Sequence, residues 1–193
     1  MKRIAIFASG SGTNAENIMN YFDKSEIIKV AMVLSNKQDA FVLERAKKHG
    51  VDSFVFTRTE FYDSEIVDEV MVQKSIDYIV LAGFLWLMPE RLIHKFQNRI
   101  INIHPALLPK YGGKGMYGMR VHEAVIANKE KESGITIHDV NENYDEGSII
   151  FNATCKIEPG DTPESLADKI HLLEYKYFPA TIERWILKNR RIS

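Results

Sequence analysis

The sequence has a single cysteine, Cys155, among its 193 residues. One cysteine cannot form an internal disulfide, so we expect a protein of a reducing compartment, the cytoplasm. The surrounding segment, SIIFNATCKI, alternates in the way a β-strand does. This pattern favours a packing role for Cys155 over a nucleophilic one.

Long hydrophobic runs are also lacking. The N-terminus, MKRIAIFASGSG, begins with charged residues as a signal peptide does, but its apolar run over residues 4–8 is too short for one and stops at glycines. No stretch approaches the roughly 20 apolar residues that a membrane-spanning helix needs. We therefore expect no membrane partner.

The chain has no excess of charge of either sign. Lys and Arg number 25 and Asp and Glu 26, which gives a net charge of −1 and no reason to expect nucleic acid as a partner. The composition, 45% hydrophobic and 26% charged, is that of a soluble globular protein. The length predicts a single domain over residues 1–193. We expect a monomer or a homodimer.

Short apolar runs alternate with helical patterns over the first hundred residues. Strands are predicted at residues 3–8, 27–35, 51–56, 77–83 and 99–103, and helices at 15–22, 40–50, 64–75 and from about 89. This alternation predicts an α/β, Rossmann-like fold with a mostly parallel twisted sheet and helices on both faces.

The pattern changes after residue 119. A helix is predicted at 120–129, two strands at 133–140 and 147–157, and a long helix at 162–188. The two strands are close enough in sequence to pair antiparallel. Thr162 is the expected N-cap of the last helix, Pro163 its first residue, and Pro179 is expected to kink or break it.

A glycine-rich loop, SGSGTN, follows the first strand and opens the first helix. Thr13 or Asn14 is the expected helix cap. Backbone N–H groups at a helix N-terminus attract anions, and glycines let the chain turn toward a ligand. The spacing matches neither the dinucleotide fingerprint nor the P-loop, so a single phosphate monoester is the favoured ligand over a tight structural turn.

Asn102 and His104 lie two residues apart in the strand NIH, so their side chains project from the same face. In open parallel sheets, ligands bind beyond the carboxyl ends of the strands, where both this pair and the glycine loop emerge. A histidine can transfer protons near neutral pH, and a nearby carboxylate would favour its charged form. Asp145 is the preferred partner, and Asp139 is the rival.

The chain lacks other catalytic signatures. It has no nucleophile elbow, no HExxH, no paired CxxC and no clustered metal ligands, so no metal is expected. An amide donor and an imidazolium that stabilise an oxyanion, with the histidine relaying protons, remain as the favoured chemistry.

The segments SGSGTN, VLAGFLWLM, NIHPALLPKY and HDVNENYDEG, with the spacing between them, resemble the folate-dependent formyltransferases. NIHPALLP is typical of the whole superfamily, and GSGTN of the phosphoribosylglycinamide formyltransferases of purine synthesis. The resemblance covers essentially the whole chain. It implies transfer of the formyl group of 10-formyltetrahydrofolate, a cosubstrate, to the amine of glycinamide ribonucleotide. The N-terminal half would bind the ribonucleotide phosphate and the C-terminal half would complete the folate site.

The resemblance also implies roles for individual residues. Asn102, His104 and Asp145 would be catalytic, with Asp145 raising the pKa of His104, and the Leu108–Pro109 bond would be cis. The implied substrate contacts are Gly12, Thr13 and Asn14 for the phosphate, and His171 and Glu174 for the glycinamide part. The implied folate contacts are Leu85, Trp86, Leu87, Met88, Asn102, Asn141, Glu142, Asn143 and Tyr144.

The chain departs from the family pattern in three places. Trp86 stands where the family usually has a basic residue, which removes a contact to a folate carboxylate. Gly112 replaces a proline, and extra residues precede the next helix. The folate glutamate tail has no obvious cationic partner, and Arg58 is the available candidate.

Four rivals remain at the level of sequence. Formyltransferases that act on methionyl-tRNA or on a nucleotide sugar amine usually carry a further C-terminal domain. A deformylase usually carries an added N-terminal one. A noncatalytic module that binds a phosphorylated metabolite is the rival from another class of protein.

Overall fold

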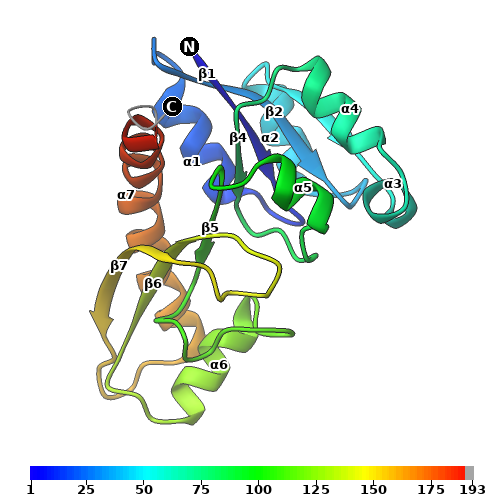
Figure 1. The fold of residues 1–193 in the computed structure, drawn as a ribbon. Helices are drawn as coiled ribbons and strands as arrows, with labels where there is room; N and C mark the ends of the chain where they lie inside the picture. Colours follow the sequence, from blue (N-terminus) through cyan, green and yellow to red (C-terminus); the bar gives the residue numbers. More distant parts are fainter. Residues whose placement is uncertain (190–193) are drawn as a thin grey trace. The chain divides into compact units, whose positions relative to one another are not determined.

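The computed structural model describes residues 1–189, which divide into two units (Figure 1). The first unit is Met1–Ile101, and the second begins at Asn102. The boundary falls inside strand β5, Ile100–His104. The two units are described in turn.

The first unit is built on parallel strands in the order β3-β2-β1-β4, with the first residues of β5 next to β4. Ile6 of β1 pairs with Val33 on one side and with Val80 on the other. Because such a strand is covered on both faces, residues 4–7 of β1 are all apolar and buried. The strand bounds are β1 Lys2–Phe7, β2 Ile28–Ser35, β3 Asp52–Val55 and β4 Tyr78–Leu81.

Helices connect these strands. They are α1 Thr13–Phe22, α2 Phe41–Lys48, α3 Arg58–Tyr62, α4 Ile66–Gln73 and α5 Glu90–Lys95. The prediction that Thr13 or Asn14 caps α1 is wrong, because Gly12 is the N-cap and supplies no side chain. Helix α3 was not predicted. It begins with a capping box in which the Thr57 hydroxyl accepts from the Glu60 N–H while the Glu60 carboxylate accepts from the Thr57 N–H.

Aromatic side chains fill the core beyond the end of β1. Phe7, Phe56 and Phe61 are almost completely buried, and the last two rings stack with their centroids 4.8 Å apart. Phe84 and Trp86 pack on this group, with Phe84 5.4 Å from the ring of Phe7. Buried aromatic rings contribute large apolar areas. They give residues 83–88 a rigid support.

The second unit consists of the end of β5, two long strands and two helices. β6, Glu132–Asp139, lies next to β5 and pairs antiparallel with β7, Ile149–Lys156. Helix α6, Met119–Ala127, packs on α7, Pro163–Asn189, which also contacts both long strands. The predicted α/β fold, with a mostly parallel sheet and a late antiparallel strand, is confirmed.

Helix α7 begins as predicted but does not break where a break was expected. Pro163 is its first residue, and the Thr162 hydroxyl accepts a 3.2 Å hydrogen bond from the Ser165 N–H, as expected of an N-cap. The predicted break at Pro179 does not occur, since the helix continues past this buried residue to Asn189. No helix within residues 1–189 is long and apolar enough to cross a membrane.

Candidate active site

The glycine loop of the first unit turns sharply at Gly12. This residue has φ 72°, and a Cβ atom on it would lie 2.4 Å from Cγ2 of Val42. Glycine is therefore required at position 12 for two reasons: the left-handed backbone and the close approach of α2. The turn opens α1, whose first N–H groups have no acceptor inside the helix and can bind an anion.

Helix α2 holds this loop from outside. The Val42 N–H donates to the Gly10 carbonyl at 3.1 Å, and Arg45 Nε donates to the Ser11 carbonyl at 2.8 Å. Arg45 also forms an ion pair with Glu16 of α1. Sequence reasoning missed Arg45, because a charged residue in an amphipathic helix is usually solvated.

A second loop, residues 83–88, lies against the glycine loop. The Ser9 N–H donates to the Gly83 carbonyl at 3.0 Å, and the Leu85 N–H donates to Ser9 Oγ at 3.1 Å. The buried Ser9 thus joins the loops that follow β1 and β4. Of the predicted folate contacts, Leu85 is exposed and Met88 is buried. Trp86 and Leu87 are half-buried.

A cation, the Arg58 guanidinium, lies over the ring of Trp86. The Arg58 guanidinium lies 5.7 Å from the centre of the Trp86 ring and 4.9 Å from that of Tyr62, within the range of cation–π attraction. The Tyr62 hydroxyl in turn donates to the Leu87 carbonyl at 2.9 Å. A positive group is therefore present beside the position where the basic residue of the family pattern is missing.

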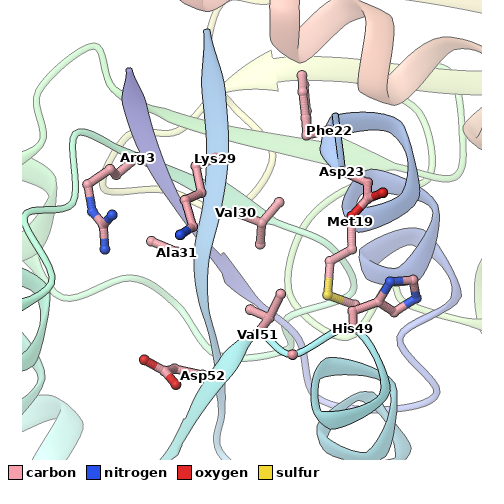
Figure 2. Close-up of a pocket in the computed structure, with 11 residues that line it drawn as sticks. Arg3, Met19, Phe22, Asp23, Lys29, Val30, Ala31, His49, Val51 and Asp52 are labelled. Carbon is pink, nitrogen blue, oxygen red and sulfur yellow. The ribbon is translucent and has the colours of Figure 1, made fainter. Parts of the chain in front are cut away.

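A cavity of about 330 Å³ in the first unit lies elsewhere (Figure 2). Its walls include the first residues of three strands, namely Arg3 of β1, Lys29 of β2 and Asp52 of β3. It therefore opens at the amino ends of the strands, whereas the glycine loop follows their carboxyl ends. Ligands of open parallel sheets bind at the carboxyl ends, so this cavity is not the candidate site.

The second unit brings the predicted catalytic residues together. Asn102 and His104 are on β5, and the loop after β6 carries Asp145 back to them. Asp145 Oδ2 lies 3.5 Å from His104 Nδ1, and Asp145 Oδ1 lies 3.5 Å from Asn102 Nδ2. The carboxyl of the rival, Asp139, instead accepts a 3.1 Å hydrogen bond from the indole N–H of Trp185.

His104 is buried, and protein oxygens face both of its ring nitrogens. Nε2 lies 2.7 Å from the carbonyl oxygen of Tyr111, which can only accept, so Nε2 carries a hydrogen. Burial lowers the pKa of His104, and His138 adds to this effect. Asp145 and the Tyr111 carbonyl act in the opposite direction without reversing it. The expected influence of Asp145 is present, but burial outweighs it.

Asp145 is held in place by the glycine segment that follows His104. The Gly113 N–H donates to Asp145 Oδ2 at 2.9 Å, and Asp145 itself has φ 58°. A Cβ atom on Gly112 would lie 2.5 Å from Leu108 and 3.3 Å from Asp145 Cβ. Burial acts to raise the pKa of Asp145, but the contacts with His138, His104 and Gly113 together lower it. The carboxyl is therefore ionised at neutral pH.

His138 of β6 is a member of this cluster that sequence reasoning missed. Its Nε2 lies 3.0 Å from Asn102 Nδ2 and 3.6 Å from Asp145 Oδ1, and its ring is 2% exposed. Its Nδ1 lies 2.8 Å from the Asp139 carbonyl oxygen. The available signal was its place in a strand that could lie beside NIH, but strand order cannot be read from one sequence.

The remaining predicted contacts of the second unit lie on the loop after β6 and on α7. The Asn143 N–H donates to Asn141 Oδ1 at 3.1 Å, which tightens the turn before Asp145. His171 is exposed and stacks on Tyr175, whereas Glu174 is buried. The other members of the loop are Glu142, which is exposed, and Tyr144, which is half-buried.

A further buried histidine, His122 of α6, lies within electrostatic reach of the cluster. Burial, and then the charges of His171 and His104, lower the pKa of His122 to about 4. Its ring is therefore neutral at neutral pH. In the described part of the chain, no three His, Cys, Asp or Glu residues are grouped so that they could hold a metal ion.

Comparison with known proteins decides the family. The profile described as formyl transferase matches residues 2–182, which is nearly the whole chain. The chain belongs to the formyl transferase family. The motif NIHPALLP begins in the last residues of β5 and continues into the following loop, where the Leu108–Pro109 bond is cis, as the resemblance implies.

Similar formyl transferases occur in plants and bacteria. The chain is 40% identical over 184 residues to the chloroplastic phosphoribosylglycinamide formyltransferase of Arabidopsis thaliana. The matched region spans 92% of this chain and 63% of the plant protein. It is 35% identical to the Haemophilus influenzae phosphoribosylglycinamide formyltransferase, over 98% and 89% of the two chains. The crystal structure of phosphoribosylglycinamide formyltransferase from Bacillus halodurans superposes with a TM-score of 0.85 at 38% identity, covering 95% and 94%. The chain thus spans less than two thirds of the plant relative.

Proposed function

We propose that this formyl transferase moves the formyl group of 10-formyltetrahydrofolate to the amine of glycinamide ribonucleotide, in purine biosynthesis. The observation that carries the proposal is the cluster of the buried His104 with the half-buried Asn102 and Asp145, in a chain similar to phosphoribosylglycinamide formyltransferases. The single, half-buried Cys155, whose thiol pKa is raised by burial, suits a reducing cytoplasm.

The reaction is a direct transfer between two nitrogens. The substrate amine attacks the formyl carbon, a C–N bond forms, and the carbonyl oxygen becomes an oxyanion. His104 Nε2–H and the Asn102 amide donate hydrogen bonds to that oxygen. The C–N bond to tetrahydrofolate then breaks, and its nitrogen receives the proton that the attacking amine loses. The His104 imidazolium, stabilised by Asp145, would give its Nε2 proton to the leaving nitrogen and then take the proton that the former amine loses.

The first unit would supply the binding loops. Gly12, Thr13 and Asn14, at the start of α1, would hold the phosphate of the ribonucleotide by their backbone N–H groups. Leu85, Trp86, Leu87 and Met88 would contact the folate from the first unit. In the second unit, the folate contacts would be Asn141 to Tyr144. His171 and Glu174 of α7 would contact the glycinamide part.

The cation beside Trp86 suggests how this chain would bind the folate tail. Arg58 is anchored over two aromatic rings, which reduces the conformational freedom that a carboxylate contact must otherwise restrict. A carboxylate of the folate tail would therefore be bound by Arg58. This contact would substitute for the basic residue that the family pattern has at position 86.

The test is a turnover assay with the purified full chain, glycinamide ribonucleotide and 10-formyltetrahydrofolate, followed by the absorbance of the folate product. The variant His104→Ala is compared with His94→Ala, a change at an exposed position of α5. We expect turnover in the native chain and in His94→Ala, and its loss in His104→Ala with both ligands still bound. Turnover with a different amine alone would refute the substrate assignment. Ligand binding without turnover in the native chain would indicate a noncatalytic binding module.

A further inference from the structure

Helix α3 is too short to hold its own position. It has five residues, Arg58–Tyr62, whereas isolated helices shorter than about 12–15 residues are only marginally stable in water. The place of α3 therefore depends on its contacts with the rest of the first unit. Phe61 supplies one of them, because it is completely buried and its ring stacks on Phe56. Further polar contacts are made at the C-terminal end of the helix.

The side chain of Arg91, on α5, binds the C-terminal end of α3. Its Nη2 donates to the Phe61 carbonyl at 2.6 Å, and its Nη1 donates to the Tyr62 carbonyl at 3.4 Å. The last carbonyls of a helix have no partner within it, and the helix dipole favours a cation there. One guanidinium thus satisfies two main-chain acceptors and joins α3 to α5.

The Arg91 guanidinium is itself held by a carboxylate. Its Nε donates to Asp68 Oδ2 at 2.8 Å, and the side chain of Asp68, on α4, is buried. Lys95, one turn further along α5, lies 3.6 Å from the other oxygen of this carboxylate. Because a guanidinium is planar and rigid, its contact with Asp68 also fixes the direction in which its other two nitrogens point.

On its other side, α3 contacts the loop of residues 83–88. The Tyr62 hydroxyl donates to the Leu87 carbonyl at 2.9 Å, and the Tyr62 ring lies 6.0 Å from that of Trp86. Arg58, the first residue of α3, lies over both rings. The direction of the Leu87 carbonyl and the place of the Arg58 guanidinium therefore both depend on where α3 lies.

We propose that Arg91 is a positioning residue for the folate cosubstrate and that it acts through α3. The proposal rests on the proposed function, because it requires 10-formyltetrahydrofolate to bind along the loop of residues 83–88. Arg91 holds Tyr62 where its hydroxyl fixes the Leu87 carbonyl, and it holds Arg58 where its guanidinium can bind the folate tail. Loss of Arg91 should therefore weaken folate binding and leave the chemical step unchanged.

Two variants remove the donors of Arg91 without leaving a buried charge unpaired. Replacing Arg91 alone with an apolar residue would leave the Asp68 carboxylate without its main partner, which costs stability whatever Arg91 does for the folate. The double variant Asp68→Leu/Arg91→Met removes both charges and keeps apolar volume in their place. Arg91→Lys keeps the charge beside Asp68, but one ammonium group cannot make all three contacts of the guanidinium.

Two further variants complete the set. Tyr62→Phe deletes only the hydroxyl that donates to the Leu87 carbonyl. Arg99→Gln is the matched control, because Arg99 is half-buried like Arg91 and also donates to two main-chain carbonyls, but at the amino end of β5. Loss of an arginine that binds the main chain is therefore compared at two places in the same unit.

The first experiment needs no ligand. Leu87 and Met88 form the only Leu–Met pair of the sequence, so the full chain with ¹³C-carbonyl leucine and ¹⁵N-methionine gives one NMR signal that reports the Leu87 carbonyl. Tyr62→Phe shows where this signal lies when the hydrogen bond is lost. We expect both Arg91 variants to move it in the same direction, and Arg99→Gln to leave it unchanged. A native signal in the Arg91 variants, or in Tyr62→Phe, would overturn the proposal.

The second experiment measures steady-state kinetics by the absorbance of the folate product. In the double variant we expect KM for 10-formyltetrahydrofolate to rise about five- to twentyfold, and in Arg91→Lys and Tyr62→Phe about three- to fivefold. The kcat value and KM for the ribonucleotide should change less than about twofold, because neither the chemical step nor the phosphate loop is altered. Arg99→Gln should match the native chain in all three constants.

Two kinetic results would refute the role assigned to Arg91. A purely structural residue would lower the free energy of unfolding in urea but leave KM for the folate at its native value. A fall of kcat with both KM values unchanged would place the effect on the chemical step instead. If the native chain turns over a different amine, or none, the proposed substrate is wrong, and the Leu87 carbonyl signal still decides whether Arg91 holds α3.

Discussion

Replacing Asp145 with asparagine tests the centre of the site. The change keeps the shape of the side chain and one acceptor oxygen for the Gly113 N–H, but it removes the charge beside two imidazole rings. With an effective dielectric constant of about 20, Coulomb's law gives roughly 5 kcal/mol between unit charges separated as Asp145 and His104 are. Because burial opposes this attraction, about 3 kcal/mol of it remains in the transition state. This corresponds to a loss of about a hundredfold in kcat.

The matched variant is Asp139→Asn, which alters the other acid considered for this role. Its carboxyl accepts from the Trp185 indole, and an asparagine oxygen can do the same. We expect Asp139→Asn to lower kcat at least tenfold less than Asp145→Asn, measured by the same absorbance assay at saturating substrates. If Asp145→Asn keeps more than about a tenth of the native kcat, the electrostatic reasoning is wrong. A larger effect of Asp139→Asn would assign the role to the rival acid.

The charge of Asp145 should also make the stability of the fold depend on pH. The pKa of Asp145 in the folded protein is below its ordinary value of 3.8. The contribution of Asp145 to the free energy of unfolding is therefore fully present above pH 3.8. It is lost as the pH falls through the lower pKa that this carboxyl has in the folded protein. A charge-assisted hydrogen bond is roughly twice as strong as a neutral one, so Asp145→Asn should reduce the free energy of unfolding by about 1 kcal/mol at pH 7. Urea unfolding of the variant and of the native chain should converge at low pH.

Two further substitutions test the binding loops of the first unit. Gly12→Ala places a methyl group against Val42 and forces a left-handed backbone, so the free energy of unfolding should fall by about 2–4 kcal/mol, with KM for the ribonucleotide raised at least tenfold. Urea unfolding and steady-state kinetics measure both, and an unchanged KM would remove this loop from the phosphate site. Arg58→Ala should raise KM for 10-formyltetrahydrofolate about three- to tenfold and leave KM for the ribonucleotide unchanged. Equal KM values for 10-formyltetrahydrofolate in Arg58→Ala and in the native chain would exclude Arg58 from the folate site.

The strand pattern and the chemistry of single residues could be predicted from the sequence. Apolar runs that end at glycine mark β1 and β4, and the two-residue spacing of Asn102 and His104 places them on one strand face. Asp145 was preferred over Asp139 because a loop residue is free to reach another strand. The structure places it against His104.

Other features depend on contacts between distant parts of the chain. His138 joins the site because β6 lies beside β5, a pairing that no local pattern records. The role of Gly12 follows from the closeness of Val42, thirty residues further on. Gly113 belonged to a segment that looked like a departure from the family, yet it donates directly to Asp145.

The contact between His104 and the Tyr111 carbonyl has a consequence for substrate binding. A main-chain carbonyl oxygen 2.7 Å from Nε2 is chemically the same kind of acceptor as a formyl oxygen. The Tyr111 carbonyl thus accepts from a buried N–H that would be costly to leave unpaired. Under the proposed function, substrate binding would exchange this carbonyl for a formyl oxygen of similar hydrogen-bond strength. The selectivity of that exchange would depend on the negative charge that develops on the formyl oxygen during the reaction, which the Tyr111 carbonyl does not acquire.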